Sequence, residues 1–213
     1  MAERFPGLYV ILDAALCSGS PVDLAERLSS SGALLLQYRD KHASARRLHE
    51  ICAAIAQRLE ASRTRFVVND RADIAALVGA GGVHVGQEDL PVAAARAIVG
   101  PDGWIGCSTH TLDQVREADS TDADYIAFGP IFPTSTKAAP DPVVGLDGLR
   151  QARALTRKPL VAIGGIRLDL AEQVWRAGAD SVAVAADILS APDPGARVRA
   201  YRGLETSAFL ARS

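Results

Sequence analysis

Short apolar runs alternate with amphipathic segments along the whole chain. Each run is rich in valine, isoleucine, leucine and alanine, as expected for a buried β-strand, and the segment after it has apolar residues at helical spacing. Leu48, Ile51, Cys52, Ile55 and Leu59, for example, fall on one face of a helix. The predicted strands cover residues 7–13, 33–39, 66–68, 83–85, 104–108, 125–129, 160–163 and 181–186.

Several predicted helices carry start signals. Ser20 followed by Pro21 is typical of a helix N-terminus, and Thr111 with Gln114 has the spacing of a capping box. Four prolines make residues 130–144 the one long irregular stretch, and a helix is expected after it. A weaker, arginine-rich helical segment closes the chain.

Eight strand signals thus alternate with eight helical ones, without a break in composition. This alternation indicates a parallel sheet with right-handed crossovers. An open doubly wound sheet is one such arrangement, but eight repeats in about 200 residues favour a closed barrel. We therefore predict an α/β fold in which residues 1–213 form a single (β/α)8 TIM barrel domain with parallel strands.

Composition narrows the class of protein. The net charge of -2 gives no reason to expect a nucleic-acid partner, and no apolar run approaches the roughly 18 residues of a membrane span. Three cysteines without paired spacing favour a reduced, cytoplasmic setting. Homo-oligomer formation stays open.

Polar side chains concentrate where predicted strands end, which is where barrel enzymes carry their chemistry. Asp70 follows one strand and Asp89 follows the next. On neighbouring parallel strands both carboxylates leave the same rim, and Mg²⁺ prefers one or two carboxylates with water and phosphate oxygens completing its shell. Each aspartate alone could instead cap a helix; the pair favours a magnesium site.

The segment 37–41 ends the second predicted strand. Alternation places Gln37, Arg39 and Lys41 on one face and Tyr38 and Asp40 on the other. An amide and two cations on one face can hold a polyanion and orient a ring. The alternative is a solvated basic strand end.

Two further strand residues are polar. His84 lies inside an apolar run and is expected to be a hydrogen-bonded core residue. Ser108 has no evident His–Asp companion, so we expect it to donate a hydrogen bond to substrate rather than to act as an activated nucleophile.

Two segments suggest phosphate sites. Thr134, Ser135, Thr136 and Lys137 fall in the proline-rich loop and can clamp phosphate on a lid that excludes water. The backbone at Gly164–Gly165 and Ala185–Ala186 matches the phosphate site common after strands seven and eight of such barrels. An ordinary surface loop and a tight turn are the respective alternatives.

Two anion sites suggest two phosphorylated small-molecule substrates meeting in one cavity. If the anion beside the metal is a diphosphate leaving group, Mg²⁺ and neighbouring cations would stabilise its departing charge. Electrostatic donors of this kind are each worth about 3 kcal/mol in the transition state.

The ordered set of motifs resembles the thiamine-phosphate synthase family. The resemblance runs over most of the chain and is carried by residues 37–41, 69–71, 84–89, 106–110, 124–137 and 162–166. It implies a (β/α)8 barrel that condenses the diphosphate of 4-amino-5-hydroxymethyl-2-methylpyrimidine with a thiazole phosphate, a transferase reaction of thiamine biosynthesis. In this family diphosphate leaves first, and the thiazole nitrogen captures the pyrimidine-methyl cation.

The resemblance also implies roles for individual residues. Asp70 and Asp89 would bind Mg²⁺. Arg39, Lys41, Ser108 and Lys137 would be the catalytic residues. The pyrimidine diphosphate would be held by Gln37, Arg39, Lys41, Asn69, Ser108 and Lys137, and the thiazole phosphate by Thr134, Thr136, Gly165, Ala185 and Ala186. Tyr38, Asp40 and Ser135 fall within the same substrate-binding motifs.

The chain departs from the family pattern at one phosphate contact, and other functions are compatible with the fold. Ala185–Ala186 replaces the family's usual pair ending in serine, which keeps a backbone donor but loses a hydroxyl. A thiazole tautomerase of the same fold, a non-catalytic phosphate-ligand sensor and a phosphosugar isomerase are the alternatives. The retained diphosphate and metal residues favour the synthase.

Overall fold

The computed structural model describes residues 5–134 and 141–210. In these residues the strands pair in parallel, each with its sequence neighbour, and β1 pairs with β8 to close the barrel. The strands are β1 Leu8–Asp13, β2 Leu35–Arg39, β3 Arg65–Asn69, β4 Gly82–Val85, β5 Trp104–Thr109, β6 Tyr125–Phe128, β7 Leu160–Ile163 and β8 Ser181–Val184. The predicted (β/α)8 barrel is confirmed.

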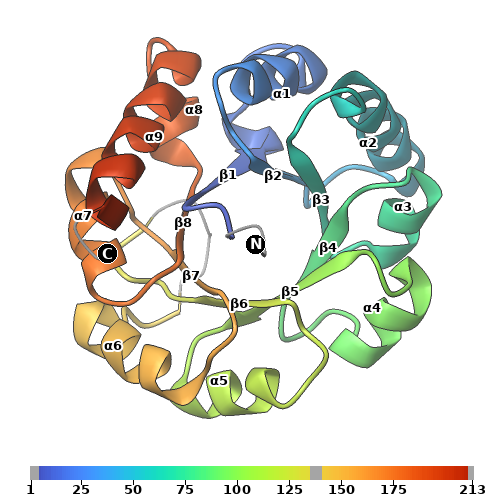
Figure 1. Ribbon diagram of the computed structural model, residues 1–213. Coiled ribbons are helices and arrows are strands. Elements are labelled where there is room, and N and C mark those ends of the chain that lie inside the picture. Colours follow the sequence, from blue (N-terminus) through green and yellow to red (C-terminus); the bar gives the residue numbers. More distant parts are fainter. Residues whose placement is uncertain (1–4, 135–140, 211–213) are drawn as a thin grey trace.

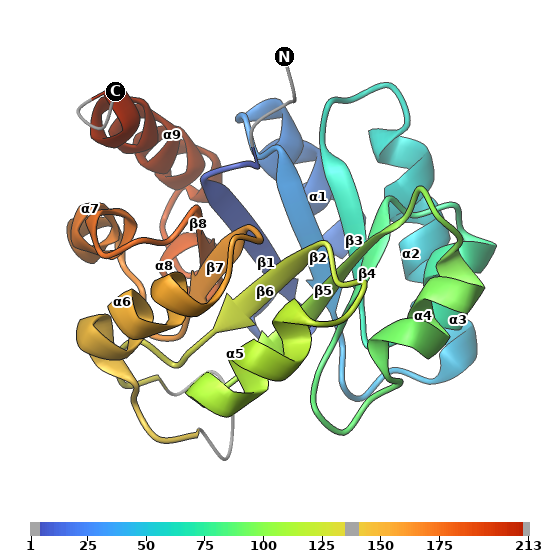
Figure 2. The ribbon, with the colours of Figure 1, turned by 60° about the horizontal axis from the view of Figure 1, so that its bottom comes forward.

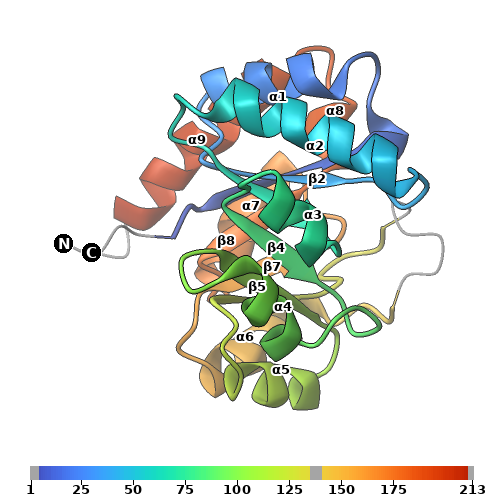
Figure 3. The same ribbon diagram turned by 90° about the vertical axis from the view of Figure 1, so that its right-hand side faces the viewer.

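Helices surround the barrel as a ring (Figure 1). They are α1 Pro21–Ser30, α2 Ala45–Leu59, α3 Ala72–Leu77, α4 Val92–Val99, α5 Leu112–Asp119, α6 Gly145–Leu155, α7 Leu168–Arg176, α8 Ala186–Leu189 and α9 Pro194–Leu210, with a 3-10 turn η1 at Ala14–Leu16. Figure 3 shows α1 and α2 along one side of the strands and α4 to α6 on the other, and Figure 2 shows α7 and α9 on the side opposite α2 to α4. None of the helices in the described ranges is long and apolar enough to cross a membrane.

Two apolar layers form the core because successive side chains of a strand face opposite sides. The outer layer lies between strands and helices and includes Val10, Leu36 and Trp175. The inner layer fills the barrel. Its buried members are Tyr9, Ile11, Leu35, Val67, Tyr125, Ala127, Val161 and Ala183.

The predicted helix starts at Ser20 and Thr111 are both confirmed. Ser20 accepts a hydrogen bond from the Asp23 N–H with Pro21 at the first helical position, and Thr111 and Gln114 form the reciprocal capping box. The end of the chain differs from prediction. Strand β8 stops at Val184, and Ala186 already begins α8. The closing helical segment is the long α9, which packs against α7, α8 and α1.

Candidate active site

Asp70 and Asp89 come together just beyond β3 and β4. Helices α3 and α4 begin after Arg71 and Pro91, and neither helix has a side-chain cap. Instead, Asp89 Oδ2 accepts a hydrogen bond from the Gly86 N–H at 2.8 Å, and the Asp89 carboxyl also hydrogen-bonds that of Asp70. The capping alternative is therefore wrong for both aspartates, and their carboxyl groups are available for other chemistry.

The electrostatics of this pair suit a divalent cation. Burial raises the pKa of Asp89, and the adjacent Asp70 carboxylate raises it further, while the Gly86 N–H and Lys41 act in the opposite direction. A cation between the two carboxylates would relieve this repulsion. No group of three or more His, Cys, Asp or Glu side chains gathers in the described ranges. Further Mg²⁺ ligands would therefore be water and substrate oxygens, as this ion commonly has.

Cations from β2 and the loop after it face the same rim. Lys41 Nζ pairs with Asp70 Oδ2, and Arg39 Nη1 donates to Asp13 Oδ2 at 2.5 Å. Gln37, on the same strand face, is buried in the barrel and donates to Tyr9 Oη at 2.6 Å. Asn69 is the last residue of β3 and pairs with His84 of β4 in the sheet. The predicted common strand face is thus present for Gln37 and Arg39, whereas Lys41 lies beyond the end of β2 and reaches the rim from the loop.

Tyr38 and Asp40 lie away from this group. The Tyr38 ring is buried in the outer layer beneath the helices. Asp40 Oδ1 accepts from the N–H groups of His42 and Ala43 and so shapes the loop before α2. The structure does not bring these two residues together with the rim carboxylates, and a contact of Tyr38 with substrate does not fit its burial.

His84 and Ser108 form a pair that the sequence did not reveal. His84 Nε2 lies 2.8 Å from Ser108 Oγ, and its Nδ1 lies 3.1 Å from Tyr125 Oη. Ser108 thus has a histidine neighbour that the sequence did not reveal, but this histidine bonds Tyr125 and not an aspartate, and the expectation of a hydrogen-bonded core histidine is confirmed. Burial lowers the pKa of His84 to about 4, and its other partner is a phenol rather than a carboxylate. His84 is therefore a weak base, which does not favour a nucleophilic Ser108.

The loop after β6 is held against the end of β7. Ile131 N–H donates to Ile163 O at 2.8 Å, and Phe132 N–H donates to Gly164 O at 3.0 Å. Gly164 and Gly165 both have positive φ, and a Cβ on Gly165 would overlap the Pro133 carbonyl oxygen. The close approach that requires these glycines is thus to the loop itself.

Thr134 is the last described residue of this loop, so the clamp predicted at Ser135, Thr136 and Lys137 lies outside the described residues. At the end of β8, Ala185 precedes the first turn of α8, which Ala186 begins. Asp187 in that turn accepts from Leu168 N–H at 3.2 Å and Tyr201 Oη at 2.8 Å. These bonds fix α8 against α7 and α9.

Sequence reasoning missed two polar residues of the interior. Tyr9 and Tyr125 are fully buried inward-facing phenols whose oxygens lie 2.9 Å apart. The alternation of strand residues could have revealed them. Tyr9 and Tyr125 occupy positions of their strands that face the barrel interior, where a buried hydroxyl needs a hydrogen-bond partner.

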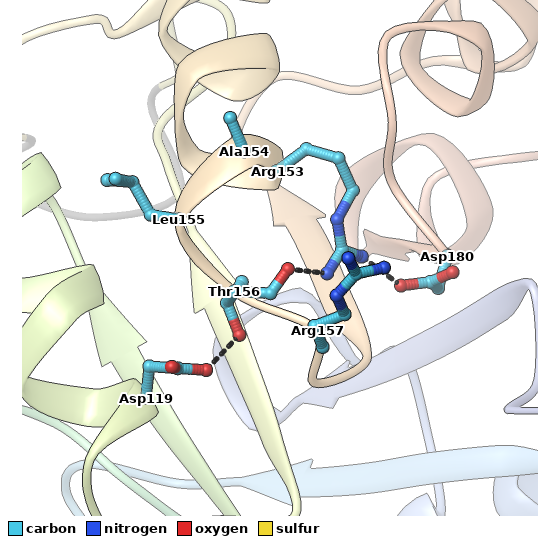
Figure 4. Close-up of a pocket in the computed structure, with 7 residues that line it drawn as sticks. All are labelled: Asp119, Arg153, Ala154, Leu155, Thr156, Arg157 and Asp180. Carbon is cyan, nitrogen blue, oxygen red and sulfur yellow. Dashed lines mark hydrogen bonds and ion pairs between the residues drawn. The ribbon is translucent and has the colours of Figure 1, made fainter.

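A hollow lies at the face of the barrel opposite this rim, where β7 and β8 begin (Figure 4). Arg153 dominates it and donates to Asp180 Oδ2 at 2.7 Å and to Lys158 O at 3.0 Å. Thr156 Oγ1 donates to Asp119. These polar groups are partners of one another, and this end of a barrel commonly serves stability. The catalytic candidate is therefore the rim at the carboxyl ends of the strands.

The chain is similar to known proteins over nearly its whole length. The family model described as thiamine monophosphate synthase matches residues 8–188. The thiamine-phosphate synthase of Koribacter versatilis is 47% identical over 194 residues, covering 89% of this chain and 92% of that protein. That of Moorella thermoacetica is 41% identical, covering 94% and 96% respectively.

A solved structure agrees with the sequence relatives. Thiamine phosphate pyrophosphorylase from Pyrococcus furiosus superposes with a TM-score of 0.85 at 34% identity, covering 94% of this chain and 96% of that one. The closed barrel, the carboxylate pair at its rim and the matched family model point the same way. The chain belongs to the thiamine monophosphate synthase family.

Proposed function

We propose that this chain is a thiamine-phosphate synthase. It joins the diphosphate of 4-amino-5-hydroxymethyl-2-methylpyrimidine to a thiazole phosphate and releases diphosphate. Family membership supports the reaction class, and the rim geometry supports the chemistry. The observation that carries the proposal is the Asp70–Asp89 carboxyl pair, which caps no helix and stands beside Lys41.

Asp70 and Asp89 would hold Mg²⁺, which when bound supplies positive charge to the diphosphate oxygens. Arg39 and Lys41 approach the same rim from β2 and the loop after it. Both now pair with carboxylates on neighbouring strand ends, and diphosphate binding would bring them a second anion. Positive charge fixed where negative charge develops lowers the barrier to breaking the carbon–oxygen bond.

The remaining residues would orient the two organic rings. Gln37 and Ser108 would contact the pyrimidine, with Asn69 and Lys137 completing the diphosphate site. Thr134, Thr136, Gly165 and the backbone at Ala185–Ala186 would hold the thiazole phosphate on the other side of the mouth. The unpaired cysteines Cys17, Cys52 and Cys107 fit a cytoplasmic enzyme.

The test is incubation of the protein with both precursors and Mg²⁺. We expect release of diphosphate together with a product that becomes fluorescent on oxidation, as a thiamine does. Omission of the thiazole phosphate is the control, because product formation needs both rings. Absence of the fluorescent product with both precursors present would reject the synthase and leave the tautomerase, for which conversion of the thiazole alone is the assay.

A further inference from the structure

A continuous chain of hydrogen bonds crosses the barrel interior below the mouth. Gln37 Nε2 donates to Tyr9 Oη at 2.6 Å, and Tyr9 Oη lies 2.9 Å from Tyr125 Oη. Tyr125 Oη lies 3.1 Å from His84 Nδ1, and His84 Nε2 lies 2.8 Å from Ser108 Oγ. This interior chain therefore joins two side chains assigned to the pyrimidine through three buried ones.

Proton counting fixes the direction of the interior chain. Tyr9 accepts from the Gln37 amide, so its single proton goes to Tyr125, and the Tyr125 proton goes to His84 Nδ1. Because Nδ1 of His84 accepts this proton, the ring carries its own proton on Nε2. That proton goes to Ser108 Oγ. The Ser108 hydroxyl proton is then directed onward, away from the chain.

The fold makes room for the middle of this chain. Gly106 faces inward on β5, and a Cβ there would overlap both the Tyr125 ring and His84 Nδ1. Phe5 also packs against the Tyr125 ring, with ring centroids 5.3 Å apart. Tyr125 is thus held in place by its ring, independently of its hydroxyl.

We propose that Tyr125 is a positioning residue that makes Ser108 a hydrogen-bond donor and leaves Gln37 Oε1 as an acceptor toward the substrate ring. This inference rests on the proposed function, because an aminopyrimidine offers the complementary pair: an amino group that donates and a ring nitrogen that accepts. The interior chain would contact the ring, and its side-chain hydrogen bonds do not include the carboxylates of Asp70 and Asp89.

The first test compares two ligands by calorimetry in the presence of Mg²⁺. Tyr125→Phe removes only the hydroxyl, so that nothing then fixes which ring nitrogen of His84 carries the proton. We expect about tenfold weaker binding of the pyrimidine diphosphate, the size of one lost hydrogen bond to a buried group, with inorganic diphosphate unchanged within twofold. Equal weakening of both ligands, or no weakening of either, would overturn the proposal.

Two further variants distinguish a positioning role of Tyr125 from a general loss of structure. Tyr201→Phe removes an equally buried phenol, one that donates to Asp187, and should leave both affinities unchanged. On a Ser108→Ala background, Tyr125→Phe should have no further effect, because Tyr125 acts through Ser108. Additive losses would assign Tyr125 a merely structural role.

The tautomer itself can be observed without substrate. In ¹⁵N spectra of the histidine side chains, with His84 assigned from a His84→Gln variant, the wild-type protein should show a proton on Nε2. Tyr125→Phe should give a mixture of tautomers. A wild-type proton on Nδ1 would overturn the proposal. Failure of the synthase reaction would reject the proposed function but would leave this spectrum as expected.

Discussion

Asp70 shows how a single residue is shaped for the site. Its φ of 62° makes it the one non-glycine residue with positive φ in the ranges that the structure describes. Its N–H donates to His84 O at 2.7 Å, which ties the strained turn to the neighbouring strand. Left-handed backbone is unfavourable for most residues but tolerated by aspartate, and it often marks functional positions. The turn directs the carboxylate toward Lys41 and Asp89 rather than toward the start of α3.

Asp89→Asn should lower turnover by about a hundredfold at saturating substrates and Mg²⁺, as expected for loss of one transition-state charge partner. Asparagine can still accept from Gly86 N–H, so the melting temperature should change little. Diphosphate release is the measurement. Asp73→Asn, at an exposed aspartate paired with Arg71, is the control and should keep wild-type turnover. Wild-type activity of Asp89→Asn would remove the metal assignment.

His84 should make stability depend on pH. Its pKa in the folded chain is about 4, against 6.5 unperturbed, so between these values the unfolded chain binds a proton that the folded chain does not. Stability is therefore lost as the pH falls through this window, by about 3 kcal/mol in total.

Urea unfolding at several pH values measures this slope. His84→Gln should lose that part of the pH dependence, whereas His42→Gln, at an exposed histidine, should keep it. An unchanged slope in His84→Gln would mean that folding does not lower the pKa of this imidazole.

The contacts between residues of the site were predictable from the sequence to different degrees. The meeting of Asp70 with Asp89 followed from the sequence, because neighbouring parallel strands end at one rim. The contact of His84 with Ser108 did not follow. This contact requires that both residues face the barrel interior from their strands and that Gly106 has no side chain. No local pattern around Ser108 carries that information.

Among the elements, the loop after β6 depends on the glycine pair after β7. Gly165 and Gly79 have nearly equal φ values of 65° and 63°, but only Gly165 faces a neighbour that a Cβ would meet. Alanine at either site incurs the left-handed strain of about 1–2 kcal/mol. Gly165→Ala should lose more stability than Gly79→Ala, and it should raise the KM for thiazole phosphate because Pro133 must move.

Unfolding free energies and KM values of the two variants test this difference. Equal losses of stability with an unchanged KM in Gly165→Ala would mean that the loop does not depend on this close approach.

Helix α6 is fastened to the start of β8 by Arg153. The Arg153 guanidinium donates hydrogen bonds to Asp180 and to the carbonyl groups of Thr156 and Lys158. Arg153→Ala therefore leaves several partly buried acceptors without this donor. We expect a loss of about 2 kcal/mol in unfolding free energy with kcat unchanged.

Arg150→Ala on the same helix is the matched control. Arg150 pairs with exposed Asp147, the one ion-pair partner it has among the described residues, and such pairs are worth about 0.3–0.5 kcal/mol. Urea unfolding and turnover measure both effects. A large fall of kcat in Arg153→Ala would show that this face of the barrel is coupled to the chemistry.

At the scale of the whole molecule, barrel closure assembles the site. β1 lies between β2 and β8, so the Asp13–Arg39 pair and the turn at Ala185 share one rim although they are far apart in sequence. In the proposed function, the anion-binding groups on both sides of the mouth would then reach two substrates at once. Ligand binding to such a site should stabilise the entire barrel, because the site exists only in the closed fold.

Mg²⁺ together with inorganic diphosphate should therefore raise the melting temperature. At a concentration of 100 Kd the gain is about 2.7 kcal/mol, roughly 5–10 °C for a chain of this size. Chelation of Mg²⁺ or the Asp89→Asn substitution should remove most of the shift. An equal shift with chelator present would mean that diphosphate binds without the metal.

The sequence by itself determined the fold class and the polar character of the rim. Strand and helix periods are local, their alternation leaves few topologies, and polar residues at strand ends stand out against apolar strand interiors. Tyr38 shows that the sequence does not assign every rim residue correctly. Its motif suggested a substrate contact, but the structure buries its ring in the outer layer.

Only the tertiary structure decided what meets inside the barrel. Tyr9 and Tyr125 are 116 residues apart, yet their oxygens lie 2.9 Å from each other. Such contacts join strands that are not neighbours in the sheet. They depend on the register around the closed barrel and on which side chains are small enough to leave space. These are properties of the assembled barrel, so no short stretch of sequence contains them.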